Sequence, residues 1–104
     1  MKHILEECRY LQQIIQSGIT FESFIRDETL KRAVVRSLEI IGEATKNIPI
    51  DEKLKYPNIK WKQMAGMRNR LIHEYMGINY IIVWDVLTEN IPVLMKQIEE
   101  ALRN

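Results

Sequence analysis

The stretch from Trp61 to Tyr75 holds the residues whose types and spacing could do chemistry, above all Arg68 and His73. A histidine that titrates near neutrality can accept and return a proton, and an arginine can stabilise negative charge that develops on phosphorus oxygens. RNA supplies its own nucleophile, the 2′-hydroxyl, so its cleavage needs neither a bound metal ion nor an activated water. The residue types therefore fit an RNA-cleaving site, although spacing alone equally fits an ordinary surface helix.

Spacing predicts that this stretch is one helix, which begins near Lys60 or Trp61 and ends at Gly77. On such a helix Asn69 and His73 lie four residues apart on one face, so Asn69 can hydrogen-bond the imidazole. Arg68 and His73 would lie roughly 140° apart around the helix axis. A joint site then needs the Arg68 side chain to wrap round the helix, or a symmetry-related copy to bring a second motif close.

A glycine inside this predicted helix calls for an explanation. Gly66 in a helix interior costs about 1 kcal/mol relative to alanine. Close approach of another helix or subunit would offset that cost. The alternative without catalysis for the whole stretch is an exposed helix that carries an Arg70–Glu74 ion pair at helical spacing.

The rest of the chain has the patterns of helices that would position this stretch. We expect an all-α fold, an antiparallel bundle of four to five helices forming a single domain over residues 1–104. Pro92 removes a backbone donor and should kink the last helix near residues 88–92. The predicted segments are a helix over 2–17, a short turn capped by Thr20, a helix from Asp27 to about Asn47, a helical turn around 51–55, the helix over 60–77, and a last helix capped by Asn79.

Composition excludes several classes of protein. The formal net charge is +1, so RNA binding needs a local basic patch. The single cysteine, Cys8, excludes an internal disulfide and fits a reducing cytoplasm, and no apolar run approaches a membrane span. Two histidines without paired cysteines predict no metal or cofactor. The candidate patch consists of Lys31, Arg32, Arg36, Lys60, Lys62, Arg68 and Arg70.

The order Arg68-Asn69-Arg70-Leu71-Ile72-His73 resembles the signature of the HEPN superfamily, an arginine followed by a polar residue and then a histidine. Glu74-Tyr75 extends it to the Arg-x4-His-x-Tyr form typical of HepT-like toxins. Four more segments are similar to the family pattern: 38–44 (Leu-Glu-Ile-Ile-Gly-Glu-Ala), Tyr56-Pro57 with Trp61, 65–69 (Ala-Gly-Met-Arg-Asn) and Val83-Trp84.

This resemblance implies a helical bundle that homodimerises, with two motifs facing each other across a cleft. It implies a metal-independent endoribonuclease toxin whose antitoxin is a minimal nucleotidyltransferase that adenylylates the motif tyrosine, here Tyr75. Arg68 and His73 would be the catalytic pair, with Asn69 in support. Glu43 is suspected to line the same cleft; its alternative is a surface pair with Lys46.

A second function stays open. The same helix face could belong to a non-catalytic HEPN module that binds a nucleotidyltransferase partner or a nucleotide. Purified protein that leaves RNA intact would favour that alternative.

Overall fold

The computed structural model describes residues 1–73 and 77–103, and of Ile72 and His73 only the backbone. The elements in chain order are α1 (Lys2–Gln16), α2 (Phe21–Arg26), α3 (Glu28–Lys46), α4 (Ile50–Lys55), α5 (Trp61–Ala65), α6 (Met67–Leu71), β1 (Ile72–His73), β2 (Gly77–Ile78), α7 (Tyr80–Asp85), η1 (Val86–Asn90) and α8 (Ile91–Arg103). The predicted all-α class is confirmed, since the only strands among the described residues form a two-residue pair.

Local capping explains where three of the helices begin. Thr20 and Ser23 form a reciprocal capping box at the start of α2. The Asp27 carboxylate accepts the backbone N–H of Leu30 at the start of α3, and the Asn79 amide oxygen accepts two backbone N–H groups at the start of α7. All three predicted N-terminal caps are confirmed.

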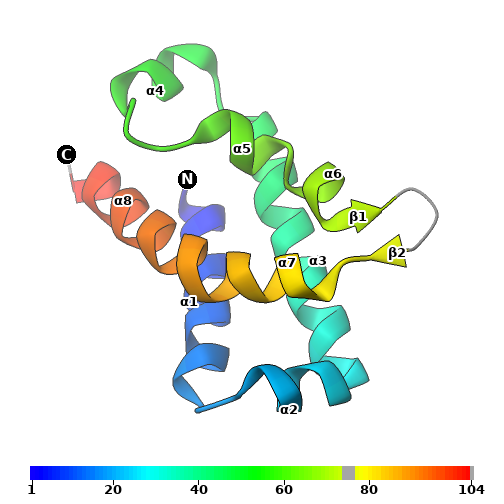
Figure 1. Ribbon diagram of the computed structural model, residues 1–104. Helices are drawn as coiled ribbons and strands as arrows, with labels where there is room; N and C mark the ends of the chain where they lie inside the picture. Colours follow the sequence, from blue (N-terminus) through cyan, green and yellow to red (C-terminus); the bar gives the residue numbers. More distant parts are fainter. Residues whose placement is uncertain (74–76, 104) are drawn as a thin grey trace.

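Three long helical segments make up most of the architecture (Figure 1). Helices α1 and α3 run in opposite directions, joined by α2, and the segment α7–η1–α8 crosses in front of them. The core between these segments is aliphatic, with Leu11, Leu38 and Ile98 fully buried. The short helices α5 and α6 lie against α3, so α3 is the main scaffold for the candidate site.

The last helical segment contains a π-helical turn just before Pro92. Pro92 has no backbone N–H, so the carbonyl of Thr88 lacks its usual helical donor. The N–H of Ile91 bonds instead to the carbonyl of Val86, which widens the turn over η1. The structure shows this wide turn over residues 86–90, and the kink predicted near residues 88–92 stays a prediction. Near the end of α8, Leu102 is 41% exposed.

The predicted continuous helix over 60–77 is wrong. Gly66 ends α5, and α6 ends at Leu71. The backbone of His73 is extended and pairs with Gly77, which has a φ of +74°. The pairing of residues 72–73 with 77–78 takes the place of the helical hydrogen bonds that a helix continuing to Gly77 would make. Asn69 and His73 consequently do not share a helix face.

Close helix packing occurs at Gly42 and not at Gly66. A Cβ on Gly42 would lie 3.2 Å from the carbonyl oxygen of Met64 and 3.4 Å from the Cβ of Met67. A Cβ on Gly66 would meet only backbone oxygens of its own turn, at 3.5 Å and beyond. The absence of a side chain at Gly42 thus lets α3 contact the α5–α6 junction directly.

We expect Gly42→Val to lower the free energy of unfolding by about 1–3 kcal/mol, because added carbons would push α5 away from α3. Gly66→Ala is the matched control and should change it by no more than about 1 kcal/mol, because its Cβ meets only ordinary contacts. Urea unfolding followed by circular dichroism measures both. Equal effects for the two variants would contradict this packing.

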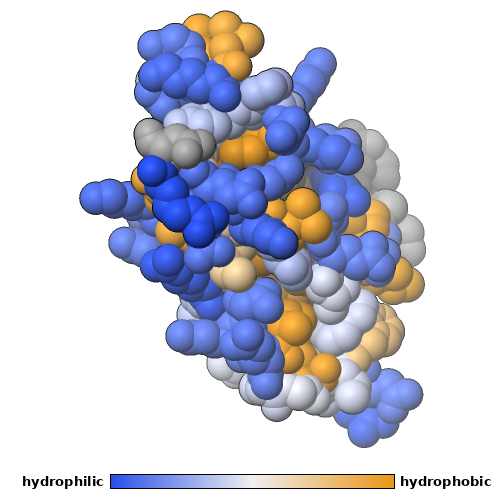
Figure 2. Space-filling view, turned by 90° about the vertical axis from the view of Figure 1, so that its left-hand side faces the viewer, coloured by the Kyte–Doolittle hydropathy of each residue, from blue (hydrophilic) through white to orange (hydrophobic). Residues whose placement is uncertain are grey.

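Hydrophilic side chains cover most of the face shown in Figure 2, and apolar patches interrupt them. One such patch lies at the top, at the height of α4 in Figure 1. On α4, Ile50 is 70% exposed and Leu54 is 72% exposed. No helix in the described part of the chain is both long and apolar enough to cross a membrane.

Candidate functional site

Arg68 and Glu43 line the same small cavity between α3 and the α5–α6 junction. The cavity has a volume of about 150 Å³. Arg68 is exposed at the start of α6, and Gly42 beside Glu43 allows α6 to lie close to α3. The complete lining is Arg36, Glu39, Gly42, Glu43, Lys46, Ala65 and Arg68.

Charge in this cavity is mixed, with three basic side chains and two carboxylates. Residues 36, 39, 43 and 46 follow one another at helical spacing along one face of α3. Glu43 Oε1 lies 3.9 Å from Lys46 Nζ, and the Glu43 side chain is 69% exposed. Such a surface pair contributes little to stability. Glu43 therefore lies near Lys46, as the surface-pair interpretation expects, and it also lines the Arg68 cavity, while its place in a dimer cleft stays a prediction.

The other predicted site residues lie one after another beyond Arg68. Asn69 is exposed on α6. The backbone of His73 lies in β1, opposite Gly77, and the N–H of Asn79 bonds to the carbonyl of Leu71 at 2.9 Å. Tyr75 lies outside the described residues. Strand β2 and Asn79 thus lie back against β1 and the end of α6.

The candidate basic patch is only partly a common surface. Lys31 does not belong to it, because its side chain is 10% exposed and its Nζ lies 2.8 Å from Glu28 Oε1. The same ammonium lies 4.6 Å from the ring centroid of Tyr80. The hydrogen bond from Lys31, reinforced by its charge, lowers the pKa of Glu28. Lys31 is therefore a structural cation that ties α3 to α7.

Two further basic positions face other surfaces. Lys60 lines a separate cavity against α8, and Lys62 lines an apolar groove beside α4. Arg36 and Arg68 are the patch members that share the cavity described above, and Lys46 joins them there. Sequence analysis missed the contribution of Lys46 and Glu39 to this cavity. Their three- and four-residue spacing from Glu43 was the available signal.

Cys8 is not a candidate nucleophile. Its side chain is fully buried on α1, and burial, with a smaller contribution from the charge of Glu7, raises the pKa of its thiol to about 12. The thiol is therefore neutral at physiological pH. Over residues 1–73 and 77–103, no group of three or more His, Cys, Asp or Glu side chains is placed to hold a metal ion.

The two tryptophans have structural contacts. Trp61 Nε1 donates to the carbonyl oxygens of Lys53 and Tyr56, at 3.0 and 3.1 Å, and so fixes the connection between α4 and α5. Trp84 packs against Phe21 and Phe24, with ring centroids 5.8 and 5.4 Å apart. Both tryptophans therefore serve packing within the fold.

The structure is thus a small helical protein in which the Arg-x4-His motif starts on the short helix α6 and ends in β1, with Arg68 on a charged surface cavity. The chain belongs to the family described as "Ribonuclease HepT-like", whose model matches residues 4–101. The resemblance found in the sequence is thereby confirmed.

Curated relatives are similar over most of their length. A protein of Caldanaerobacter subterraneus subsp. tengcongensis named "Putative RNase" is 50% identical over 99% of this chain and 91% of its own. One named "Putative RNase" from Methanocaldococcus jannaschii is 49% identical over 85% of this chain and 73% of its own. "Probable ribonuclease HepT" of Thermococcus cleftensis is 41% identical over 96% and 90%. No solved structure matches the chain.

Proposed function

We propose that this chain is a metal-independent endoribonuclease, with Arg68 and His73 as its catalytic pair, and that it acts as the toxin of a toxin–antitoxin pair. The observation that carries the proposal is that Arg68 lines an exposed cavity together with further basic side chains. Arg68 stands five residues before His73, and the chain belongs to the HepT-like family. The named relatives described as RNases support the same reaction class.

In the proposed reaction the RNA 2′-oxygen attacks the adjacent phosphorus. A bond forms between this oxygen and phosphorus as the bond from phosphorus to the 5′-oxygen breaks. One His73 imidazole accepts the 2′-hydroxyl proton, and an imidazolium gives a proton to the leaving 5′-oxygen. Arg68 stabilises the negative charge on the non-bridging oxygens, for which its planar fork is suited. The products are a 2′,3′-cyclic phosphate and a 5′-hydroxyl.

A homodimer would supply both histidines. One imidazole acts as base and the other as acid if two copies bring their motifs together across a cleft. Arg68 is exposed on α6, so it is available to such a shared cleft. Asn69, also exposed there, is the supporting polar group in this proposal. Glu43 limits the positive charge of the cavity, and its carboxylate lies 3.9 Å from Lys46 Nζ.

Purified protein is expected to cleave single-stranded RNA in excess EDTA and to leave 2′,3′-cyclic phosphate ends. An oligonucleotide of the same sequence with every 2′-oxygen methylated should stay intact, because it lacks the nucleophile. Gel analysis and mass spectrometry of the products measure both. RNA that remains intact under all conditions would favour the non-catalytic partner module, and cleavage only after metal addition would contradict the proposed chemistry.

Regulation in this proposal acts on Tyr75. A partner nucleotidyltransferase would let the Tyr75 hydroxyl oxygen attack the α-phosphorus of ATP, releasing pyrophosphate and leaving an adenylyl group. That bulky anion two residues from His73 would block the site and repel RNA phosphate.

Tyr75→Phe is expected to cleave RNA at the wild-type rate and to stay active after treatment with the nucleotidyltransferase and ATP, because it has no hydroxyl to modify. Tyr10→Phe is the matched control, since Tyr10 is exposed on α1 at 43%. It should be modified and silenced like the wild type. Intact-mass spectrometry and the cleavage assay give the two readouts. Silencing of Tyr75→Phe would contradict this mechanism.

A further inference from the structure

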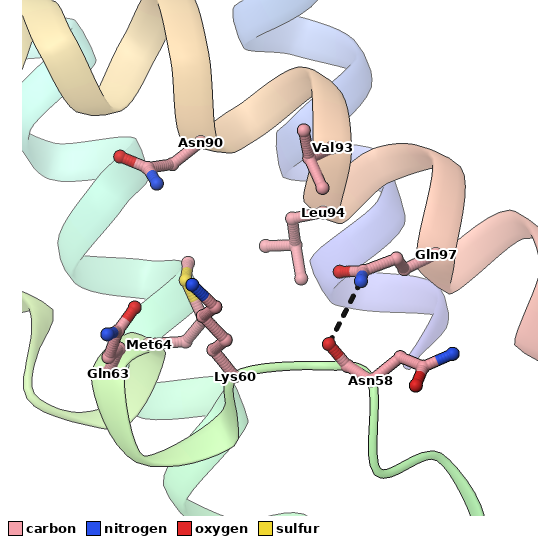
Figure 3. Close-up of a pocket in the computed structure, with 8 residues that line it drawn as sticks. All are labelled: Asn58, Lys60, Gln63, Met64, Asn90, Val93, Leu94 and Gln97. Atoms are coloured by element: carbon pink, nitrogen blue, oxygen red, sulfur yellow. Dashed lines mark hydrogen bonds between the residues drawn. The ribbon is translucent and has the colours of Figure 1, made fainter.

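A second cavity lies between the start of α5 and the junction of η1 with α8 (Figure 3). Its volume is about 180 Å³. Sites that enclose a whole drug-sized ligand are roughly 300–1,000 Å³, so this cavity admits one small ring system rather than a complete nucleotide. It is lined by Asn58, Lys60, Gln63, Met64, Asn90, Val93, Leu94 and Gln97.

The apolar part of this cavity suits the face of a flat ring. Met64 and Leu94 are 6% and 4% exposed, so their accessible atoms lie at the bottom of the cavity. Val93 is 57% exposed and forms part of its edge on α8. Apolar and sulfur-containing side chains of this kind pack favourably against aromatic rings.

The polar part offers paired donors and acceptors. Gln97 Nε2 donates to the carbonyl oxygen of Asn58 at 3.0 Å, which fixes that amide at one end of the cavity. The side chains of Gln63 and Asn90 make no hydrogen bond to any described residue, and Figure 3 shows both beside the cavity from opposite elements. Each free amide presents one donor group and one acceptor, the combination that reads the edge of a nucleobase.

The charge of the cavity fits an attached phosphate. Lys60 is exposed at the N-terminal end of α5 and forms no ion pair with the described residues. None of the described side chains that line the cavity is a carboxylate. A base in the cavity can therefore place its own backbone phosphate near Lys60 without meeting a repelling group.

The fold holds Asn90 here through the π-helical turn. Asn90 is the last residue of η1, the widened turn that arises before Pro92. Single π-helical turns occur frequently at functional sites, because they re-aim a side chain that a regular helix would direct elsewhere.

The α5–α6 segment connects this cavity with Arg68. Gln63 lies on α5, and only Gly66 separates α5 from α6, where Arg68 lies. Five residues of chain span at most roughly 18 Å even when fully extended, so Gln63 lies within a few nucleotides' length of Arg68.

We propose that this cavity receives one unpaired nucleobase of the RNA strand, close to the nucleotide that is cleaved, and that Gln63 and Asn90 read its edge while Lys60 binds its phosphate. The inference rests on the proposed ribonuclease function for the identity of the strand. On this proposal, the amide-lined cavity determines which base the protein prefers close to the cleaved bond.

The test uses binding without cleavage. The probe is a short single-stranded RNA with every 2′-oxygen methylated, together with copies in which one nucleotide at a time lacks its base. Fluorescence anisotropy measures Kd for wild type, for the double variant Gln63→Leu/Asn90→Leu, and for the control Gln13→Leu/Gln16→Leu. The control removes two exposed amides from α1, away from the cavity.

Wild type and control are expected to bind one of the abasic probes roughly tenfold or more weakly than the intact probe. This is the usual scale for one stacked or bidentately read base. The double variant should bind the intact probe roughly tenfold more weakly and should not respond to that position. Thermal melts check that both double variants are folded.

The two proposals fail separately. The base site is overturned if wild type does not bind the probe, or if the double variant binds and responds to abasic positions as wild type does, whether or not RNA is cleaved. If the base dependence is present while unmodified RNA stays intact in EDTA, the ribonuclease proposal fails and the base site is supported.

Discussion

His73→Ala is expected to slow RNA cleavage by about 10²- to 10⁴-fold, the usual range for removal of a general acid or base. In a symmetric dimer the substitution would remove both proton-transferring groups at once, so the upper end is expected. The single-turnover rate in excess EDTA measures it. His3→Ala is the matched control, because His3 is the chain's other histidine and is exposed on α1; it should cleave at the wild-type rate.

The same variant separates chemistry from binding. His73→Ala should keep the affinity of wild type for the 2′-O-methyl probe within a few-fold, because the proposed role of the imidazole is proton transfer. A cleavage rate within about threefold of wild type would remove His73 from the catalytic pair. A large loss of probe affinity with an unchanged rate for bound RNA would make it a binding residue instead.

Those parts of the fold that depend on neighbouring residues could be predicted from the sequence. Thr20, Asp27 and Asn79 each satisfy backbone donors within three residues, so the starts of α2, α3 and α7 follow from local chemistry. The irregular turn before Pro92 follows in the same way from the missing N–H of that residue.

The end of the motif helix depends on longer-range competition. Met64, Met67 and Leu71 have helical spacing and are buried. Whether the chain stays helical beyond Leu71 depends on the pairing of residues 72–73 with 77–78, which the spacing of residues 61–71 does not encode. Ile72 is β-branched, and Gly77 is the residue type that turns favour; these were the signals for the strand pair that the sequence contained.

Predicting the candidate site required more than the motif. Spacing placed Arg68 and His73 on one continuous helix, and the structure separates them onto α6 and β1. The contact of Arg68 with the Glu43 cavity depends on Gly42, which lets α3 and the α5–α6 junction approach. In the sequence, close helix packing was assigned to Gly66, because Gly66 lies inside the helix predicted over 60–77. The close contact occurs instead at Gly42 on α3.

Arg68→Ala is expected to lower kcat for RNA cleavage by about 10²- to 10³-fold, the scale for loss of one group that stabilises transition-state charge. Arg68→Lys keeps the positive charge and loses the planar fork, so its cleavage rate should fall between that of wild type and that of Arg68→Ala. Both variants should be as stable as wild type within about 0.5 kcal/mol, because Arg68 is exposed. Single-turnover rates and urea unfolding measure the two properties.

Arg70→Ala is the matched control for Arg68→Ala. Arg70 is exposed on the same short helix but does not line the α3 cavity, so its loss should reduce RNA affinity only through the general phosphate attraction. That reduction should shrink as salt is raised, whereas the rate defect of Arg68→Ala on bound RNA should persist. If the two variants lose the same activity and salt abolishes both defects, Arg68 only contributes positive charge, and its assignment to the catalytic pair is wrong.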